Sequence, residues 1–355
     1  MTTSSCNLER YVPGKASIEA STVANVFSSC AGYPVILTSM WLLNTKTGIL
    51  HHFVDHTAVG EYGILSHVWG DDEQTFQQVH ELSSSATNDW EKADSSLLAG
   101  LSPKIKEVCR FTASLGLSWV WVDTCCIDKT SSSELSEAIN SMFQWYSESQ
   151  VCVTYLADVP DSRDHEIREQ AIRNSKWFTR GWTLQELIAP CAVLFVSSLW
   201  TWIGTKSTLA PLITEITGID IEVLTFQRKL AEISVARRLS WASKRHTTRV
   251  EDQAYSLQGL FGVNMPTIYG EGQAAFRRLQ EEIIKLYPDH TIYAWNNKSS
   301  ISLLASSPSD FSDSATMDTL DFAQIPRAVD QFVMTIPEVR IPHYFPFQLS
   351  HRLSL

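Results

Sequence analysis

Residues 175–190, SKWFTRGWTLQELIAP, combine two tryptophans with an arginine, a glutamine and a glutamate. In a helix, Glu186 lies on the same face as Trp182, because side chains four positions apart stack along one side. Gln185 shares that face, whereas leucine and isoleucine side chains form an opposite, core-like face. A carboxylate beside a large aromatic side chain and an amide favours the wall of a binding pocket. The alternative is an amphipathic helix end whose glutamate lies in water.

Two more polar clusters follow short apolar segments that are predicted to be strands. They are SHVWGDD at 66–72 and DTCCID at 123–128. Ligands of open parallel sheets bind beyond the carboxyl ends of the strands, so both clusters are expected near Glu186. The hypothesis is one cleft in which Glu186 is catalytic, lined by Ser66, His67, Trp69, Asp123, Asp128, Arg180, Trp182 and Gln185. The alternative is that the aspartates cap helices and that His67 is a hydrogen-bonded core residue.

Three chemistries use such residue types. A nucleophilic Cys125 or Cys126 with His67 lacks a local oxyanion hole. A Ser66–His67 dyad fails because neighbouring residues of a strand point to opposite faces. A single glutamate suffices, however, to cleave an N-glycosidic bond to an already cationic leaving group, such as the nicotinamide of NAD(P). The chain has neither a Gly-rich dinucleotide fingerprint nor a P-loop, so neither a bound redox cofactor nor an ATPase site is expected, and NAD(P) is considered only as a substrate.

Alternating segments between residues 62 and 196 must position these groups. Runs rich in β-branched or aromatic residues predict strands, and runs with 3.6-residue apolar spacing predict helices. The predicted strands are 62–68, 119–123, 151–156 and 192–196, and the predicted helices are 103–116, 134–149 and 175–190. This alternation predicts an α/β fold with a mostly parallel sheet and helices on both faces. The polar stretch 71–102 is expected to be a long loop.

Four segments divide the chain. Residues 1–39 are Ser- and Ala-rich and are expected to form a poorly ordered N-terminal extension. The α/β domain spans 40–200, a helical region follows over 201–295, and the patternless residues 296–355 predict an irregular C-terminal tail. Helices of the helical region are predicted at 205–217, 229–243, 250–261 and 271–287.

Composition and charge argue against several classes of function. A net charge of −11 disfavours nucleic acid as a partner, and the basic stretch 237–249 is predicted to be a helix surface. No apolar run approaches the roughly 20 residues that span a bilayer, and the N-terminus lacks a secretory signal, so a cytoplasmic protein is expected. The seven cysteines form no C-x-x-C pair and no histidine has zinc-ligand spacing, which predicts reduced thiols and no metal site.

The order YGILSHVWG, WVWVDTCCID and WFTRGWTLQEL closely resembles the heterokaryon incompatibility (HET) domain of filamentous fungi. The later stretch TTRVEDQAYSLQGLFGVNMPTIYGEGQAAFRRLQEEI resembles the segment that commonly follows this domain. The resemblance implies a HET domain at 40–200 with a flavodoxin-like, TIR-like fold, followed by the helical region. Cys125 and Lys129 depart from the residues that the family often has there, but neither adjoins the candidate carboxylate.

This resemblance implies a role in self/non-self recognition, in which an effector triggers regulated cell death after unlike hyphae fuse. In TIR enzymes that hydrolyse NAD, a tryptophan-to-glutamate helix supplies the essential carboxylate, and Glu186 stands at the matching position of WTLQEL. The domain is therefore either a Glu186-dependent NAD(P) glycohydrolase or a non-enzymatic signalling adaptor that acts by self-association. Its expected partners are further copies of itself or another incompatibility protein.

Overall fold

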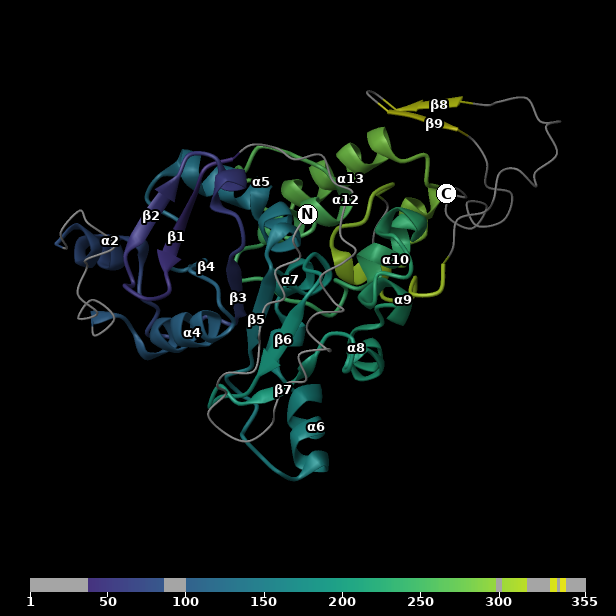
Figure 1. Ribbon diagram of the computed structural model, residues 1–355. Coiled ribbons are helices and arrows are strands. Elements are labelled where there is room, and N and C mark those ends of the chain that lie inside the picture. Colours follow the sequence, from purple (N-terminus) through teal and green to yellow (C-terminus); the bar gives the residue numbers. More distant parts are fainter. Residues whose placement is uncertain (1–37, 86–99, 298–301, 318–332, 337–338, 343–355) are drawn as a thin grey trace, which may run out of the picture.

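The computed structural model describes residues 38–85, 100–297, 302–317, 333–336 and 339–342. A seven-stranded sheet forms the centre of the α/β part, in the order β2-β1-β4-β3-β5-β6-β7 (Figure 1). Its strands are β1 (Met40–Asn44), β2 (Leu50–Phe53), β3 (Gly63–His67), β4 (Trp119–Trp121), β5 (Val151–Tyr155), β6 (Val193–Val196) and β7 (Trp202–Thr205). The four predicted strands are confirmed as β3 to β6, which lie side by side and run parallel.

The sheet as a whole is mixed, so the prediction of a mostly parallel sheet needs correction. β2 pairs antiparallel with β1, β1 with β4, and β6 with β7. The three strands that the sequence did not predict, β1, β2 and β7, lie toward the edges of the sheet. They are short, and β2 exposes His51 and His52 to solvent. Strands near an edge need less apolar sequence than central parallel strands, which explains why the pattern of apolar runs did not reveal them.

The chain passes from β3 to β4 on one side and then returns to β5 on the other side of β3. The order of the strands therefore reverses at β3. In open α/β sheets, the crevice outside the carboxyl ends of the strands at such a point is where ligands bind. The ends of β3 and β5, at His67 and Tyr155, border this crevice.

Helices cover both faces of the central strands, as predicted (Figure 1). Tyr62 donates through its hydroxyl to the carbonyl of Trp145 in α5 (Ser132–Glu148), at 2.6 Å. A Cβ atom on the next residue, Gly63, would lie 2.7 Å from the side chain of Thr112 in α4 (Pro103–Ser114). Because alternate strand residues point to opposite faces, α5 covers the face of residues 62, 64 and 66, and α4 covers the other.

Two other predicted segments differ in the structure. The stretch 71–102 is not entirely loop, because it contains α2 (Phe76–Ser84), which begins with a capping box of Thr75 and Gln78. The predicted helix 175–190 is broken into a 3-10 turn, η2 (Lys176–Thr179), and the short helix α7 (Thr183–Ile188). Trp182 thus precedes the helix that carries Glu186.

The helical region begins after β7 and packs into the same hydrophobic core as the α/β part. Its helices are shorter than predicted: α8 (Ala210–Thr217), α9 (Ile221–Leu224), η3 (Leu230–Glu232), α10 (Val235–Ser240), α11 (Asp252–Tyr255), α12 (Gln258–Phe261), α13 (Ala274–Leu286) and η4 (His290–Tyr293). η1 (His56–Val59) and α6 (His165–Arg173) complete the α/β part.

The predicted terminal segments are only partly described. The expected extension over residues 1–39 lies outside the described residues, except for 38 and 39. Within the expected tail, residues 302–317 contain η5 (Pro308–Phe311), whose Phe311 is fully buried. Farther on, β8 (Val333–Ile336) pairs antiparallel with β9 (Val339–Pro342).

Candidate functional site

Glu186 is buried at the carboxyl edge of the central strands, with 5% of its surface exposed. Its carboxylate accepts a hydrogen bond from the hydroxyl of Ser66, near the end of β3. The same hydroxyl accepts a hydrogen bond of 2.8 Å from the indole Nε1 of Trp177 in η2. Three buried polar side chains from three elements are therefore connected in one chain, Trp177 to Ser66 to Glu186.

The environment of Glu186 favours its protonated form. Burial raises the pKa of Glu186 to about 8, and the charge of Asp123 adds to the rise. The hydrogen bond from Ser66, the charge of Arg180 and the hydroxyl of Tyr146 oppose it. Glu186 is therefore mostly a neutral acid at pH 7. The alternative of a solvated glutamate at a helix end is wrong.

His67 belongs to a second polar cluster, on the opposite face of the sheet. Its Nε2 lies 3.5 Å from Oε1 of Glu73, and its Nδ1 lies 3.8 Å from Oδ1 of Asp123. Glu73 also pairs with Lys104 of α4 and accepts from the Gly70 N–H at 2.7 Å. Although burial opposes ionisation, these contacts lower the pKa of Glu73 to about 2. Ser66 and His67 thus serve different clusters.

Trp69 and two cations lie beside Asp123, which neighbours both clusters. The indole Nε1 of Trp69 donates to Oδ2 of Asp123 at 2.7 Å, while 42% of the Trp69 surface is exposed. Lys129 Nζ lies 4.0 Å from the centroid of the Trp69 ring, and the guanidinium carbon of Arg180 lies 5.2 Å from it. An exposed aromatic ring with adjacent cations is a surface on which a planar, anionic molecule can bind.

Two predicted site residues have hydrogen-bond partners outside these clusters, and a third is buried without a partner for its amide nitrogen. Asp128 accepts from Gln77 Nε2 at 2.6 Å and from the N–H and hydroxyl of Thr130, in a turn before α5, and the N-cap of α5 is Ser131 rather than Asp128. Burial raises the pKa of Asp252, and a hydrogen bond from Trp182 opposes that rise, so Trp182 faces the helical region. Gln185 is buried, and its Nε2 has no hydrogen-bond partner in the described part of the chain.

The sequence prediction missed five residues of these clusters: Glu73, Lys129, Tyr146, Trp177 and Arg245. Trp177 lies in the same stretch, 175–190, as Glu186, so a second tryptophan near the carboxylate could have identified it from the sequence. The basic stretch 237–249 was predicted to be a helix surface, yet Arg238 and Arg245 are both buried. No local pattern distinguishes these two arginines from solvated ones.

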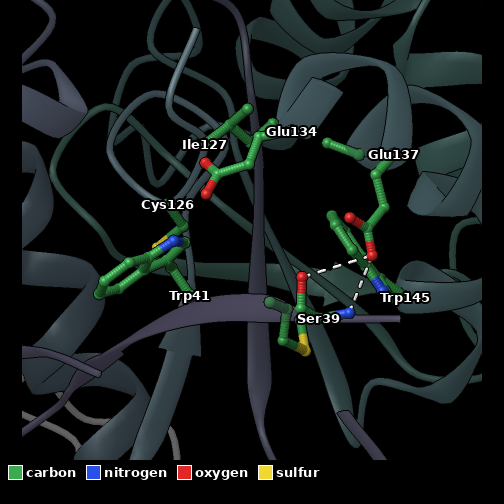
Figure 2. A pocket seen from close by; sticks show the side chains of 9 residues that line it. Ser39, Trp41, Cys126, Ile127, Glu134, Glu137 and Trp145 are labelled. Atoms are coloured by element: carbon green, nitrogen blue, oxygen red, sulfur yellow. Dashed lines mark hydrogen bonds between the residues drawn. The ribbon is translucent and has the colours of Figure 1, made fainter. Parts of the chain in front are cut away.

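A separate small pocket lies between β1 and α5 (Figure 2). Trp41, Ile127, Glu134 and Trp145 help to line it, and Glu137 accepts from the N–H and the hydroxyl of Ser39 at 3.0 and 3.3 Å. No predicted site residue lines this pocket, so it does not coincide with the candidate site.

Metal and thiol chemistry add little to the candidate site. Among the described residues, no group of three or more His, Cys, Asp or Glu side chains is arranged to bind a metal ion. Within the described ranges, four cysteines are free and buried, namely Cys109, Cys125, Cys126 and Cys152. Cys191 is disulfide-bonded, so the prediction that every thiol is reduced is wrong there.

Comparison with known families and proteins identifies the domain. The model of the heterokaryon incompatibility protein family (HET) matches residues 62–170. The chain carries a HET domain. Among curated proteins, the vegetative incompatibility protein HET-E-1 of Podospora anserina is 46% identical over 229 residues, which are 63% of this chain and 16% of that protein. A model described only as a domain of unknown function matches residues 274–301, and no solved structure matches the chain.

The match to the HET family model runs from the start of β3 into α6. It therefore includes Ser66, His67 and Asp123, but it ends before Arg180 and Glu186. In the folded chain, α7, which lies beyond the matched residues, completes the polar cluster that begins at Ser66. None of the described helices is long and apolar enough to cross a membrane.

Proposed function

We propose that this HET domain acts in vegetative incompatibility and triggers regulated cell death in the cytoplasm. It would do so by cleaving NAD(P), with Glu186 as the catalytic residue. The incompatibility role is supported by the identity to HET-E-1. The aligned segment is a sixth or less of that relative, so cell death, the substrate and the partners are proposals for this chain.

The observation that carries the proposed chemistry is a buried acid at the point where the strand order reverses. Glu186 accepts a hydrogen bond from Ser66 of β3, the strand at which the order of β4-β3-β5-β6 changes direction. Flavodoxin-like sheets have the same order of parallel strands and bind their ligand at the corresponding crevice. This order supports the analogy with TIR enzymes at the level of fold.

The proposed reaction breaks the bond between C1 of the ribose and the nicotinamide nitrogen. The bonding electron pair leaves with nicotinamide, which becomes neutral, and water adds to C1 and releases a proton. The cationic nicotinamide and the oxocarbenium-like ribose favour the ionised form of Glu186, so its proton is expected to pass to water when substrate binds. Trp69 offers a ring for stacking, and Lys129 and Arg180 offer positive charge to the phosphates.

The second candidate is a non-enzymatic adaptor that acts by self-association or through another incompatibility protein. The burial of Glu186 and its raised pKa favour this alternative, because a structural acid also becomes neutral when buried and hydrogen-bonded. In this case the hydrogen bonds of Trp177 to Ser66 and of Ser66 to Glu186 only stabilise a buried polar group in the core.

Nicotinamide release from NAD and NADP by the purified protein tests the proposal. Glu186→Gln is expected to lower the rate by about 10²–10³ while the protein stays folded, because the charge that stabilises the cationic state is lost. Glu137→Gln is the matched control, since Glu137 accepts hydrogen bonds from Ser39 outside the site, and it should retain full activity.

Expression in a fungal host separates the two candidates. If the wild-type protein releases no nicotinamide, or if an abundant Glu186→Gln protein kills as well as wild type without changing NAD(P) levels, cleavage is rejected. Concentration-dependent self-association of the killing form would then support the adaptor.

A further inference from the structure

Arg245 lies in the segment between α10 and α11, yet its guanidinium contacts the start of α7. Its Nη1 donates to the carbonyl of Arg180 and to the hydroxyl of Thr183, both at 2.9 Å. Its Nε donates to the carbonyl of Trp241 at 3.3 Å. The helical region therefore supplies a cation to the first turn of the helix that carries Glu186.

The backbone around this contact is also joined. Gly181 N–H donates to the carbonyl of His246 at 2.8 Å, and His246 N–H donates to the carbonyl of Thr179 at 2.7 Å. A Cβ atom on Gly181 would lie 2.4 Å from the methyl group of Thr247, so only glycine permits this approach. Two strand-like hydrogen bonds and a tight contact hold the segment of Arg245 against the start of α7.

The charge of Arg245 is poorly neutralised by its hydrogen bonds. Only 8% of the residue is exposed, and Nη2 has no hydrogen-bond partner within the described ranges. Thr183 and Glu186 are three positions apart and share a helix face, so the cation lies along the face of Glu186. Burial lowers the pKa of Arg245 to about 9, and the charge of Glu186 opposes that shift.

We propose that Arg245 is a positioning residue and the buried counter-charge of Glu186, aligning α7 through Thr183 and stabilising the ionised carboxylate. This inference deepens the proposed function, on which its consequence for cleavage rests. Other groups that face Glu186 are Ser66, Asp123, Tyr146, Arg180 and, against its backbone carbonyl, the thiol of Cys152. Of these, Arg180 also favours the ionised form, and it is less buried than Arg245.

The ionisation of Glu186 can be followed without catalysis. Its pKa rises from 4.5 to about 8 on folding, so the folded protein retains a proton that the unfolded chain releases between these values. The contribution of Glu186 protonation to the stability of the wild-type protein is therefore fully present below pH 4.5 and is lost as the pH rises to about 8. Glu186→Gln cannot titrate. The stability difference between Glu186→Gln and wild type should thus grow with pH and level off near pH 8.

The experiment covers pH 4 to 10 and measures the pH at which this stability difference levels off (the levelling pH). It is repeated in proteins that also carry a substitution at Arg245. Arg245→Met and Arg245→Gln are expected to raise the levelling pH by about one pH unit, because an opposite charge that favours ionisation is removed. Arg245→Lys, which keeps the charge, should restore it. Arg238→Met is the matched control, since Arg238 is also buried but donates to the carbonyl of Leu260.

The inference is overturned if both neutral variants level off at the wild-type pH, or if Arg238→Met shifts it as much. Arg245→Gln keeps an amide donor for the Arg180 carbonyl and carries the test if Arg245→Met does not fold. If the wild-type protein releases no nicotinamide, the proposed cleavage fails, but the stability measurement still decides the role of Arg245. If it does, the pH profile of the rate should shift with the levelling pH.

Discussion

Ser66 connects two buried side chains through one hydroxyl, which accepts from the indole of Trp177 and donates to Glu186. A buried polar atom that loses its partner typically costs about 1–3 kcal/mol. The effects of changes within this chain of hydrogen bonds should therefore depend on one another. Such dependence would show that the polar cluster is a unit, whether or not it is catalytic.

Ser66→Ala is expected to destabilise the protein by about 1–3 kcal/mol, because the indole N–H is left without its acceptor. Trp177→Phe should then cost less in the Ser66→Ala background than in wild type, since it also removes that orphaned N–H. Chemical denaturation of the four proteins measures the difference. Ser149→Ala is the control, because Ser149 is buried but donates to the carbonyl of Tyr146. Equal costs of Trp177→Phe in both Ser66 backgrounds would contradict the connected chain.

At the scale of elements, α7 is a six-residue helix whose ends are satisfied from distant parts of the chain. Arg245 contacts its start, and the buried Nζ of Lys206 donates to the carbonyls of Leu187 and Pro190 at its end. Isolated helices of this length are unstable in water, so tertiary contacts must supply the stability of α7. The contacts of Arg245 and Lys206 at the two ends of α7 therefore determine where Glu186 lies.

Lys206→Met tests the end contact through its pH dependence. Burial lowers the pKa of Lys206 from 10.5 to about 7, so the unfolded chain binds a proton that the folded protein has released over this window. The stability of wild type relative to Lys206→Met should consequently rise between pH 7 and 10.5, by ~1.4 kcal/mol per pH unit. Denaturation across this range measures the rise. The exposed Lys285 provides the control, and a difference for Lys206→Met as flat as that for Lys285→Met would refute the assignment.

At the scale of the whole molecule, the helical region is part of the same core as the HET domain. α12 contacts α5, where a Cβ atom on Gly259 would lie 2.2 Å from Cβ of Phe143. Arg245 and Trp182 add polar contacts between the two parts. The HET domain and the helical region are therefore expected to unfold together.

Gly259→Ala is expected to destabilise both parts by about 1–3 kcal/mol, because the added methyl group has no space beside Phe143. Proteolysis at increasing denaturant concentration should show peptides of 62–170 and 235–286 becoming accessible together, and earlier than in wild type. Gly70→Ala is the control, since a Cβ atom there would meet nothing closer than 3.9 Å. Loss of protection confined to 235–286 would show that the two parts are independent.

The sequence alone determined the central elements and the choice of Glu186. β3 to β6, α4 and α5 were predictable because buried parallel strands and amphipathic helices carry their apolar patterns locally. Glu186 was recognisable because a carboxylate beside tryptophans in otherwise apolar sequence is unusual. The resemblance to the HET family rested on local motifs, and the family match over 62–170 confirms it for YGILSHVWG and WVWVDTCCID.

Only the tertiary structure decided which polar groups meet. Ser66 and Glu186 are 120 positions apart, and a helix broken at Gly181 turns Trp182 toward Asp252 instead of toward Glu186. His67, next to Ser66, joins a different cluster because a strand alternates its faces. Arg245 could not be distinguished from a surface arginine, since burial and charge pairing arise from contacts between elements and leave no periodic signal along the chain.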